Sequence, residues 1–262
     1  MVRGRIFWGL VVLLVGVFLL LDNLGYLPGI NIWGLIWPLF LIALGGWILW
    51  NYFSRGSRQA EHIAIPVDGA QRARIRFQHG AGRIDIAAGT SQDTLIDGDF
   101  GGGVDIRNNK RSDELEIGLR MPGSIFPFDW SPGQSLDWSV RLNGEIPLAL
   151  SLETGASEAH LDLINLRVTE LSLKSGASST TLTLPSKAGL TQVDISSGAA
   201  SLNVIVPQEV AARIRSSGGL SNVSVSERFP RSGNLYQSPD YESAANKVDM
   251  AIEMGVGSVS IS

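Results

Sequence analysis

The stretch Leu152-Glu-Thr-Gly-Ala-Ser157 decides the fold, because similar stretches recur along the second half of the chain. They are Leu173-Lys-Ser-Gly-Ala-Ser178, Ile195-Ser-Ser-Gly-Ala-Ala200 and Ile214-Arg-Ser-Ser-Gly-Gly219. The repeated glycines are Gly155, Gly176, Gly198 and Gly219, at spacings of 21, 22 and 21 residues. A steady period of about 20 to 50 residues is typical of a solenoid, whose repeats pack on their neighbours in a column.

Two more distant copies bracket this set. Gly80 lies in Phe77-Gln-His-Gly-Ala-Gly-Arg-Ile84, and Gly255 lies in Ile252-Glu-Met-Gly-Val-Gly-Ser-Val259. Inside the copies, apolar residues alternate with polar ones, which indicates short strands with one inward face. We therefore expect an all-β, single-stranded β-helix or solenoid over residues 62–262.

The repeated glycine turns have a structural and a functional interpretation. Turns rich in Gly and Ser can bind phosphate or sugar, and a serine can act as a nucleophile. Glycine also supplies the positive φ of a tight corner, and serine satisfies local backbone groups. We favour the structural role for Gly80, Gly155, Gly176, Gly198, Gly219 and Gly255. The chain has no Gly-x-Ser-x-Gly and no His-Glu-x-x-His motif, so we assign no catalytic residue and no metal site.

Composition excludes several other classes of protein. Of 262 residues, 44% are hydrophobic and 18% are charged, below the ~25% usual in soluble domains, so part of the chain is expected in lipid. The net charge of −4 argues against a broad nucleic-acid-binding face. The absence of cysteine removes disulfides, thiolate metal sites and cysteine nucleophiles. His62, His79 and His160 are scattered, and we expect no cofactor.

The apolar excess predicts a transmembrane helical hairpin within residues 1–55. Two uncharged runs predict spans at about residues 6–25 and 32–52, each near the ~20 residues that a membrane helix needs. A signal peptide is the alternative, but no small-x-small cleavage site follows the first run and a second span arrives at once. Four arginines flank the hairpin and none lies in its loop, which predicts cytoplasmic N- and C-termini. Residues 56–61 are the predicted linker.

Two insertions interrupt the solenoid period, at about residues 121–138 and 227–241. The first is rich in Pro and Gly and also holds four aromatic residues: Phe126, Phe128, Trp130 and Trp138. Aromatic residues in a loop can anchor a partner, so these four are our candidate partner contacts. They can also cover an open end of the solenoid, whose edge must be protected, and we favour this capping role for the first insertion.

The chain also resembles a known family. Arg5-Ile-Phe-Trp-Gly-Leu10, Gly16-Val-Phe-Leu-Leu-Leu-Asp-Asn-Leu-Gly25 and Trp37-Pro-Leu-Phe-Leu-Ile-Ala-Leu-Gly45 resemble the membrane segment of LiaI/LiaF-like proteins. The Leu-Ser-Leu-x-Ser-Gly-Ala-Ser and Leu-Thr-Leu-Pro rungs resemble the C-terminal β-helical toast-rack domain that occurs with it. The resemblance implies a bacterial, multi-pass inner-membrane protein of the cell-envelope stress response, without enzymatic activity, that modulates a membrane histidine kinase. It supplies no catalytic or ligand-binding residue.

We therefore expect a non-enzymatic, membrane-anchored regulator or sensor that uses the solenoid as an interaction module. Its expected partners are membrane lipid and a membrane histidine kinase or another envelope protein, with no nucleic acid. One alternative is a structural scaffold that self-associates through the solenoid ends. The other is a module that binds glycans or lipid-linked precursors through Ser- and Thr-rich rungs.

Overall fold

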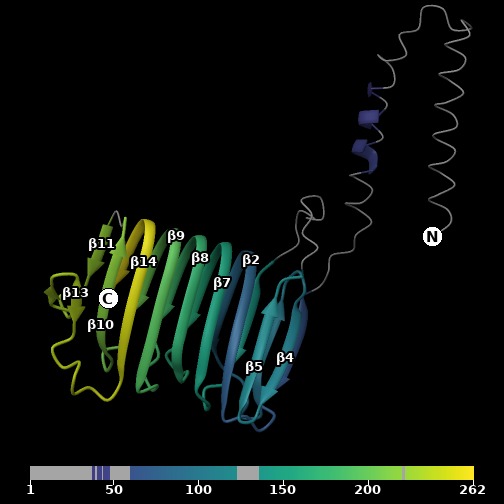
Figure 1. Cartoon of the computed structure of the whole chain (residues 1–262). Helices are drawn as coiled ribbons and strands as arrows, with labels where there is room; N and C mark the ends of the chain where they lie inside the picture. The colour runs from purple at the N-terminus through teal and green to yellow at the C-terminus, as the bar shows by residue number, and fades with distance from the viewer. Residues whose placement is uncertain (1–36, 39, 43, 48–59, 123–135, 220–221) are drawn as a thin grey trace, which may run out of the picture. The chain divides into compact units, whose positions relative to one another are not determined.

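The computed structural model describes residues 37–38, 40–42, 44–47, 60–122, 136–219 and 222–262 (Figure 1). The chain divides into two compact units, Met1–Gly56 and Ser57–Ser262. In the first unit, the described residues between 37 and 47 are helical. Over the described residues, no helix reaches the length and apolarity needed to cross a membrane. The predicted first span and both ends of the second lie outside the described residues, so the hairpin stays a prediction.

The second unit consists of strands. They are β1 (Glu61–Pro66), β2 (Arg72–Ala88), β3 (Thr94–Phe100), β4 (Asp105–Arg111), β5 (Glu114–Arg120), β6 (Trp138–Leu142), β7 (Leu148–Asp162), β8 (Val168–Thr183), β9 (Leu190–Ile205), β10 (Ala211–Gly218), β11 (Asn222–Val225), β12 (Arg231–Ser232), β13 (Leu235–Gln237) and β14 (Lys247–Ile261). All belong to one sheet, whose main path runs β1-β3-β6-β2-β7-β8-β9-β14-β10-β13-β12. This all-β architecture agrees with the predicted solenoid class.

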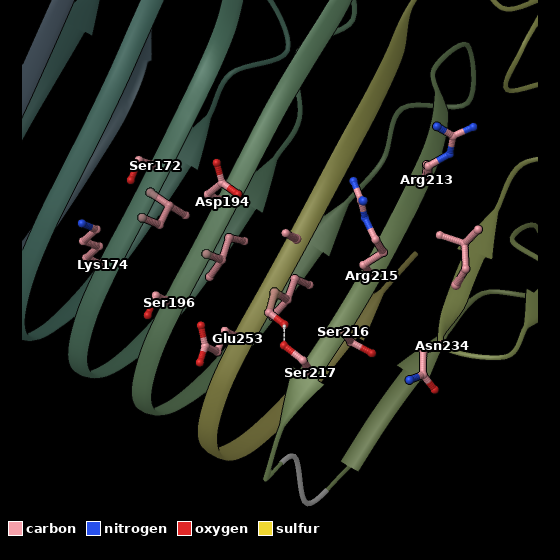
Figure 2. A pocket seen from close by; sticks show the side chains of 15 residues that line it. Ser172, Lys174, Asp194, Ser196, Arg213, Arg215, Ser216, Ser217, Asn234 and Glu253 are labelled. Atoms are coloured by element: carbon pink, nitrogen blue, oxygen red, sulfur yellow. Dashed lines mark hydrogen bonds between the residues drawn. The ribbon is translucent and has the colours of Figure 1, made fainter.

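Each long strand forms one coil of the solenoid. β2, β7, β8, β9 and β14 are 15 to 17 residues long, lie parallel to their neighbours and bend in the middle (Figures 1 and 2). We call the residues before the central glycine the first arm and those after it the second arm. In β7 the first arm buries Leu148, Leu150 and Leu152, and the second arm buries Ala159 and Leu161.

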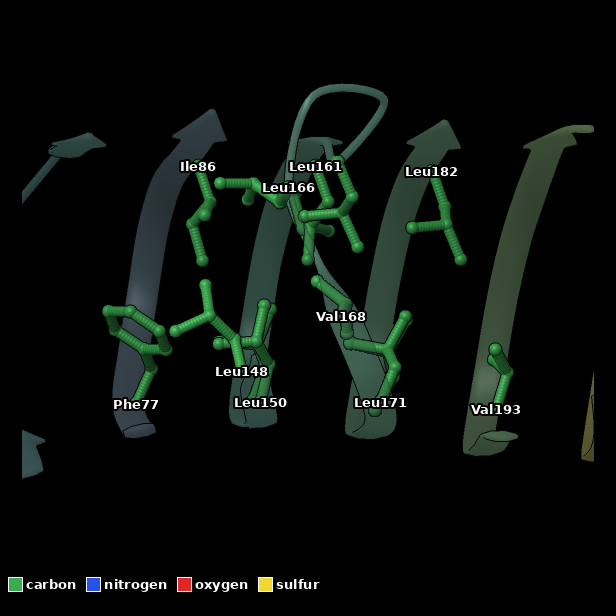
Figure 3. Packing of buried hydrophobic residues seen from close by; sticks show 14 of the residues in the cluster. Phe77, Ile86, Leu148, Leu150, Leu161, Leu166, Val168, Leu171, Leu182 and Val193 are labelled. Atoms are coloured by element: carbon green, nitrogen blue, oxygen red, sulfur yellow. The ribbon is translucent and has the colours of Figure 1, made fainter. Parts of the chain in front are cut away.

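The inward side chains of neighbouring coils pack on one another. Leu150 of β7 is the register partner of Ile75 on β2 and of Leu171 on β8, and Val193 of β9 continues the column. Figure 3 shows this apolar packing from β2 to β9. One strand buries its apolar face only when neighbours supply the rest of the core, so the stack stabilises every coil.

The order of the coils corrects one expectation. Gly255 was expected to close the series beyond Gly219, but β14 lies between β9 and β10. The spatial order of the glycines is therefore Gly80, Gly155, Gly176, Gly198, Gly255 and Gly219, each next to the one before it. Because β14 follows the long segment 226–246, it can return to a position inside the stack. Sequence period alone does not reveal this insertion.

The repeated glycines also serve a different physical purpose from the one expected. None of the six has a positive φ, so a left-handed corner is not the reason for glycine. A Cβ on Gly155 would instead lie 2.5 Å from the carbonyl oxygen of Gly80, and one on Gly176 would lie 2.8 Å from that of Gly155. The glycines therefore form a ladder in which adjacent backbones approach too closely for any side chain.

Other strands cover both ends of the stack. At one end, β5 pairs with the first arm of β2, β6 pairs with its second arm, and the outermost strands there are β4 and β1. At the other end, β13 pairs with β10 and carries β12, and β11 lies outside β14. β12 and β13 fall in the second predicted insertion.

Candidate functional site

The outer surface of the first arms forms a groove that crosses the strands. Because side chains alternate along a strand, every second residue of the first arm points away from the core. Register partners place these residues in one row: Arg107, Gly118, Arg76, Ser151, Ser172, Asp194, Ala251 and Arg215. Two adjoining hollows of about 1240 and 730 Å³ follow this row and share Ser172, Lys174 and Asp194. We call this surface the groove.

Small residues make the floor of the groove and longer ones make its sides. Ser151 and Ser172 lie in the middle row. The row on one side contains Arg74 and Glu170, whose Nη1 and Oε2 atoms are 3.5 Å apart. On the other side, Gln78 donates a 2.8 Å hydrogen bond from Nε2 to Oε2 of Glu153. Figure 2 shows Ser172, Lys174, Asp194, Ser196 and Glu253 along the part of the groove that faces β10.

Exposed arginines gather at the β2–β5 end of the groove, where Asp105 and Glu116 also line the surface. Arg76 and Arg107 flank Gly118 in the same row, and Arg120 lies on the same face. Among the described residues, none of these three exposed arginines has an ion-pair partner, whereas Arg213 pairs with Glu242 at 2.6 Å. Guanidinium groups present fixed planar donors that suit carboxylates. Because Asp105 and Glu116 line the same hollow, this end offers both signs of charge to another molecule.

The outer surface of the second arms is different. Its rows carry Ser179, Thr181, Ser201 and Asn203 on β8 and β9, and none of these four residues lines the two hollows of the groove. Glu158 lies at its edge, where His160 Nε2 is 3.0 Å from Oε1 and Arg83 Nη2 is 2.8 Å from Oε2. The hydrogen bonds from His160 and Arg83 hold the pKa of Glu158 below its usual range.

The three histidines lie in separate places, as their spacing in the sequence suggests. His62 Nδ1 is 3.1 Å from Asp99 on the exposed β1–β3 face, and His160 is paired with Glu158. His79 is buried beside Trp138, where desolvation lowers its pKa and its Nε2 lies 2.8 Å from the carbonyl oxygen of Leu136. Within the described ranges, no group of three or more His, Asp or Glu side chains is placed to hold a metal ion.

The predicted partner contacts divide into two groups. Phe126, Phe128 and Trp130 lie outside the described residues. Trp138 begins β6, is fully buried, and packs edge-on against Phe100 at 5.1 Å between ring centroids. Its indole Nε1 donates a hydrogen bond to the carbonyl oxygen of Gly101. Trp138 is therefore a core residue at the covered end of the stack and is not available to a partner.

The groove was missed by the sequence interpretation, which looked to aromatic loops for contacts. The polar residues that alternate with Leu148, Leu150 and Leu152 did indicate a polar outer surface on this strand. Their charge could not be assembled into one surface, because Arg76 and Ser151 are 75 residues apart and become neighbours only through the β2–β7 register.

Comparisons with known proteins agree with this architecture. Residues 54–205 match the model of the N-terminal domain of toast_rack, and residues 7–67 match that of the LiaF transmembrane domain. The search of curated proteins gives no significant match. A solved structure of a candidate cell adhesion protein from Clostridium sporogenes is 22% identical with a TM-score of 0.72, and the match covers 78% of this chain and 98% of that one.

A second solved structure, of a candidate adhesin from Bacteroides fragilis, is 9% identical with a TM-score of 0.28, over 79% of this chain and 98% of that one. That score is too low to support an argument. The Clostridium structure shows a shared fold, and its description as an adhesion protein applies to that protein.

The two family matches confirm the resemblance drawn from the sequence. The LiaF match indicates membrane association, and its combination with a toast-rack domain is that of a membrane-associated stress-response regulator family. The two family matches favour a protein that is not an enzyme. Because the toast_rack model covers more than half of the chain, the protein belongs to the toast_rack family and carries a LiaF-like membrane segment ahead of its solenoid.

Proposed function

We propose that this protein is a non-enzymatic regulator of the bacterial cell-envelope stress response, anchored by two N-terminal spans, and that its groove binds a membrane histidine kinase. The observation that carries the proposal is the groove itself: a polar surface on a sheet, at one end of which Arg76, Arg107 and Arg120 have no ion-pair partner among the described residues. Exposed charges of this kind favour recognition of an oppositely charged protein surface.

The repeated coils support a contact role over a chemical one. The groove residues on β2, β5, β7, β8, β9, β14 and β10 belong to strands that pair with a neighbour on both sides, so most of the surface is held in one arrangement before a partner arrives. A preorganised surface loses less conformational entropy on binding. In the described residues, moreover, no histidine faces both a serine hydroxyl and a carboxylate, so the groove offers binding groups rather than a nucleophile.

The proposed topology has both spans within residues 6–52 and both termini in the cytoplasm. The four arginines that flank the spans support the cytoplasmic termini, and the match to the LiaF transmembrane domain supports membrane association. The solenoid would then be on the same side as the catalytic part of a histidine kinase. Membrane lipid is the second proposed partner, through the spans.

The test is recovery of the kinase from native membranes with a groove variant. Arg76→Gln with Arg107→Gln removes two unpaired charges from the groove. The matched control is Arg141→Gln with Lys187→Gln, which removes two exposed charges elsewhere that also lack ion pairs in the described structure. Wild type and control should co-purify with a histidine kinase, identified by mass spectrometry, and the groove variant should not.

Two results would contradict the proposal. One is that crosslinked membranes yield no histidine kinase with the wild-type protein. The other is that the groove variant recovers as much kinase as the control, which would place the contact elsewhere.

The alternative of a polymerising scaffold has less support. β4 is the outermost first-arm strand at one end, and all seven of its residues are exposed, among them Arg107, Lys110 and Arg111. Charged side chains on an edge strand oppose the addition of a strand from another copy.

A further inference from the structure

β10 and β11 are in register with β9, although β14 lies between them and β9. Asn222, Val223 and Val225 each follow a β9 residue by 21 positions, namely Ser201, Leu202 and Val204. Each pair shares one column of the sheet, because both members are partners of the same β14 residue. The same offset of 21 relates Ile214 of β10 to Val193, through Met250. The paired residues 211–218 and 222–225 therefore have the offset of a coil that follows β9 directly.

β14 separates these matched strands. It pairs in parallel with β9 on one edge and with β10 and β11 on the other. If β14 left, the two exposed edges could pair with each other without a change of register. Apolar residues would still point inward, since an offset preserved along both arms keeps the alternation. Gly219 would then follow Gly198 in the ladder.

The lengths of the connections between coils also indicate that β10 could follow β9 directly. The β7–β8 connection, residues 163–167, crosses one strand spacing. The β9–β10 connection, residues 206–210, is equally long but crosses two spacings, because β14 is in between. Arg228 holds it there: Nη1 donates to the carbonyl oxygens of Val206 and Pro207, at 3.2 and 3.0 Å, and Nη2 donates to that of Gln208 at 2.8 Å.

We propose that the space between β9 and β10–β11 is a strand-insertion site, occupied here by β14, and that it closes in register when β14 leaves. The closed stack has β10 and β11 directly on β9, and the segment 247–261 is then free to pair elsewhere. β14 can leave because the long segment 226–246 connects it to β11. β8, in contrast, is held between β7 and β9 by the short connections 163–167 and 184–189. The proposal is independent of the function proposed above.

Disulfide trapping in the full chain tests this directly, because the protein has no cysteine of its own. Ser196, Glu253 and Ser217 point outward from β9, β14 and β10 in one row (Figure 2). Strands are about 4.8 Å apart, so Ser196 and Ser217 are about 10 Å apart at Cα, and a disulfide needs less than about 7 Å. Ser196→Cys with Ser217→Cys is too far apart to crosslink in the inserted state and comes within reach in the closed stack, whereas Ser196→Cys with Glu253→Cys reports the inserted state.

The control for general unfolding is Glu153→Cys with Ser196→Cys. These residues are also two strands apart, on either side of Lys174 of β8. Under mild oxidation, we expect the Ser196–Ser217 pair to crosslink within single chains at least about tenfold faster than the control pair, because a local opening needs less free energy than global unfolding. Adding Arg228→Gln should speed the Ser196–Ser217 pair further and leave the control pair unchanged.

Several results would overturn the proposal. It fails if the Ser196–Ser217 pair crosslinks no faster than the control, or if Arg228→Gln accelerates both pairs equally. Disulfides that form only between two chains also refute it, because they show exchange of strands between copies in place of closure.

Discussion

The glycine ladder predicts that two chemically identical substitutions have opposite effects. Gly155 and Gly80 occupy the same position in neighbouring coils, and both precede an alanine. A Cβ at Gly155 would lie 2.5 Å from the carbonyl oxygen of Gly80. Among the described residues, a Cβ at Gly80 would meet only the sulfur of Met121, at 3.9 Å, and no glycine of the ladder lies beyond β2. Neither residue has a positive φ, so backbone strain does not separate the two.

The size of the effect follows from this contact. To bring the Cβ of Gly155→Ala from 2.5 to at least 3.0 Å, the two coils must move apart by 0.5 Å at the ladder. Overpacking of this kind costs about 1–3 kcal/mol. Gly80→Ala makes no such contact and restricts the unfolded chain, so it should be neutral or stabilise the fold by up to about 1 kcal/mol.

The assay is urea unfolding of the full chain in detergent, followed by far-UV circular dichroism, with thermal melting as a second measurement. For a domain of this size, each kcal/mol corresponds to about 2–4 °C in melting temperature. The reasoning is refuted if Gly80→Ala is as damaging as Gly155→Ala, since the glycines would then be required for their backbone conformation. A neutral Gly155→Ala would also refute it, because the coils would not be in close contact.

Three further predictions concern burial, pH and topology. Trp138→Ala should destabilise the solenoid by about 3–5 kcal/mol in urea unfolding, because a fully buried indole is removed; a change below 1 kcal/mol would place Trp138 outside the core. The pKa of His79 lies below its ordinary 6.5, so the unfolded chain binds the proton first and stability falls below pH 6.5, by at most about 1.4 kcal/mol per pH unit. His79→Gln should abolish this slope, and an unchanged slope would assign it to another group. Alkaline phosphatase fused after Ser262 should be inactive in cells, and an active fusion would overturn the proposed topology.

Local patterns in the sequence were sufficient to predict the class of fold. They were insufficient to predict the order of the strands in the stack. Period-two alternation around Leu150 and the 21-residue spacing of the glycines both report local geometry, and the structure confirms an all-β stack. The position of β14 depends on a long-range choice between two edges in the same register, β9 and β10. Because β10 has the 21-residue offset of a coil that would follow β9 directly, and both strands pair in register with β14, the spacing of the glycines favours no single order.

The candidate site shows the same limit. Trp138 looked like a contact residue because it ends a Pro- and Gly-rich insertion, but residues 138–142 form a strand that buries it. The groove needs Arg76 of β2, Ser151 of β7 and Arg107 of β4 on one surface. Register across long insertions brings them together, and no motif of adjacent residues encodes that register.

Photo-crosslinking from β8 in native membranes tests the central claim most directly. Ser172 lies on the floor of the groove, and Ser179 lies on the outer surface of the second arm of the same strand. A photoreactive residue at position 172 should capture a membrane histidine kinase, and the same residue at position 179 should not. Capture from position 179 alone, or from neither position, would contradict the claim that the groove binds the kinase.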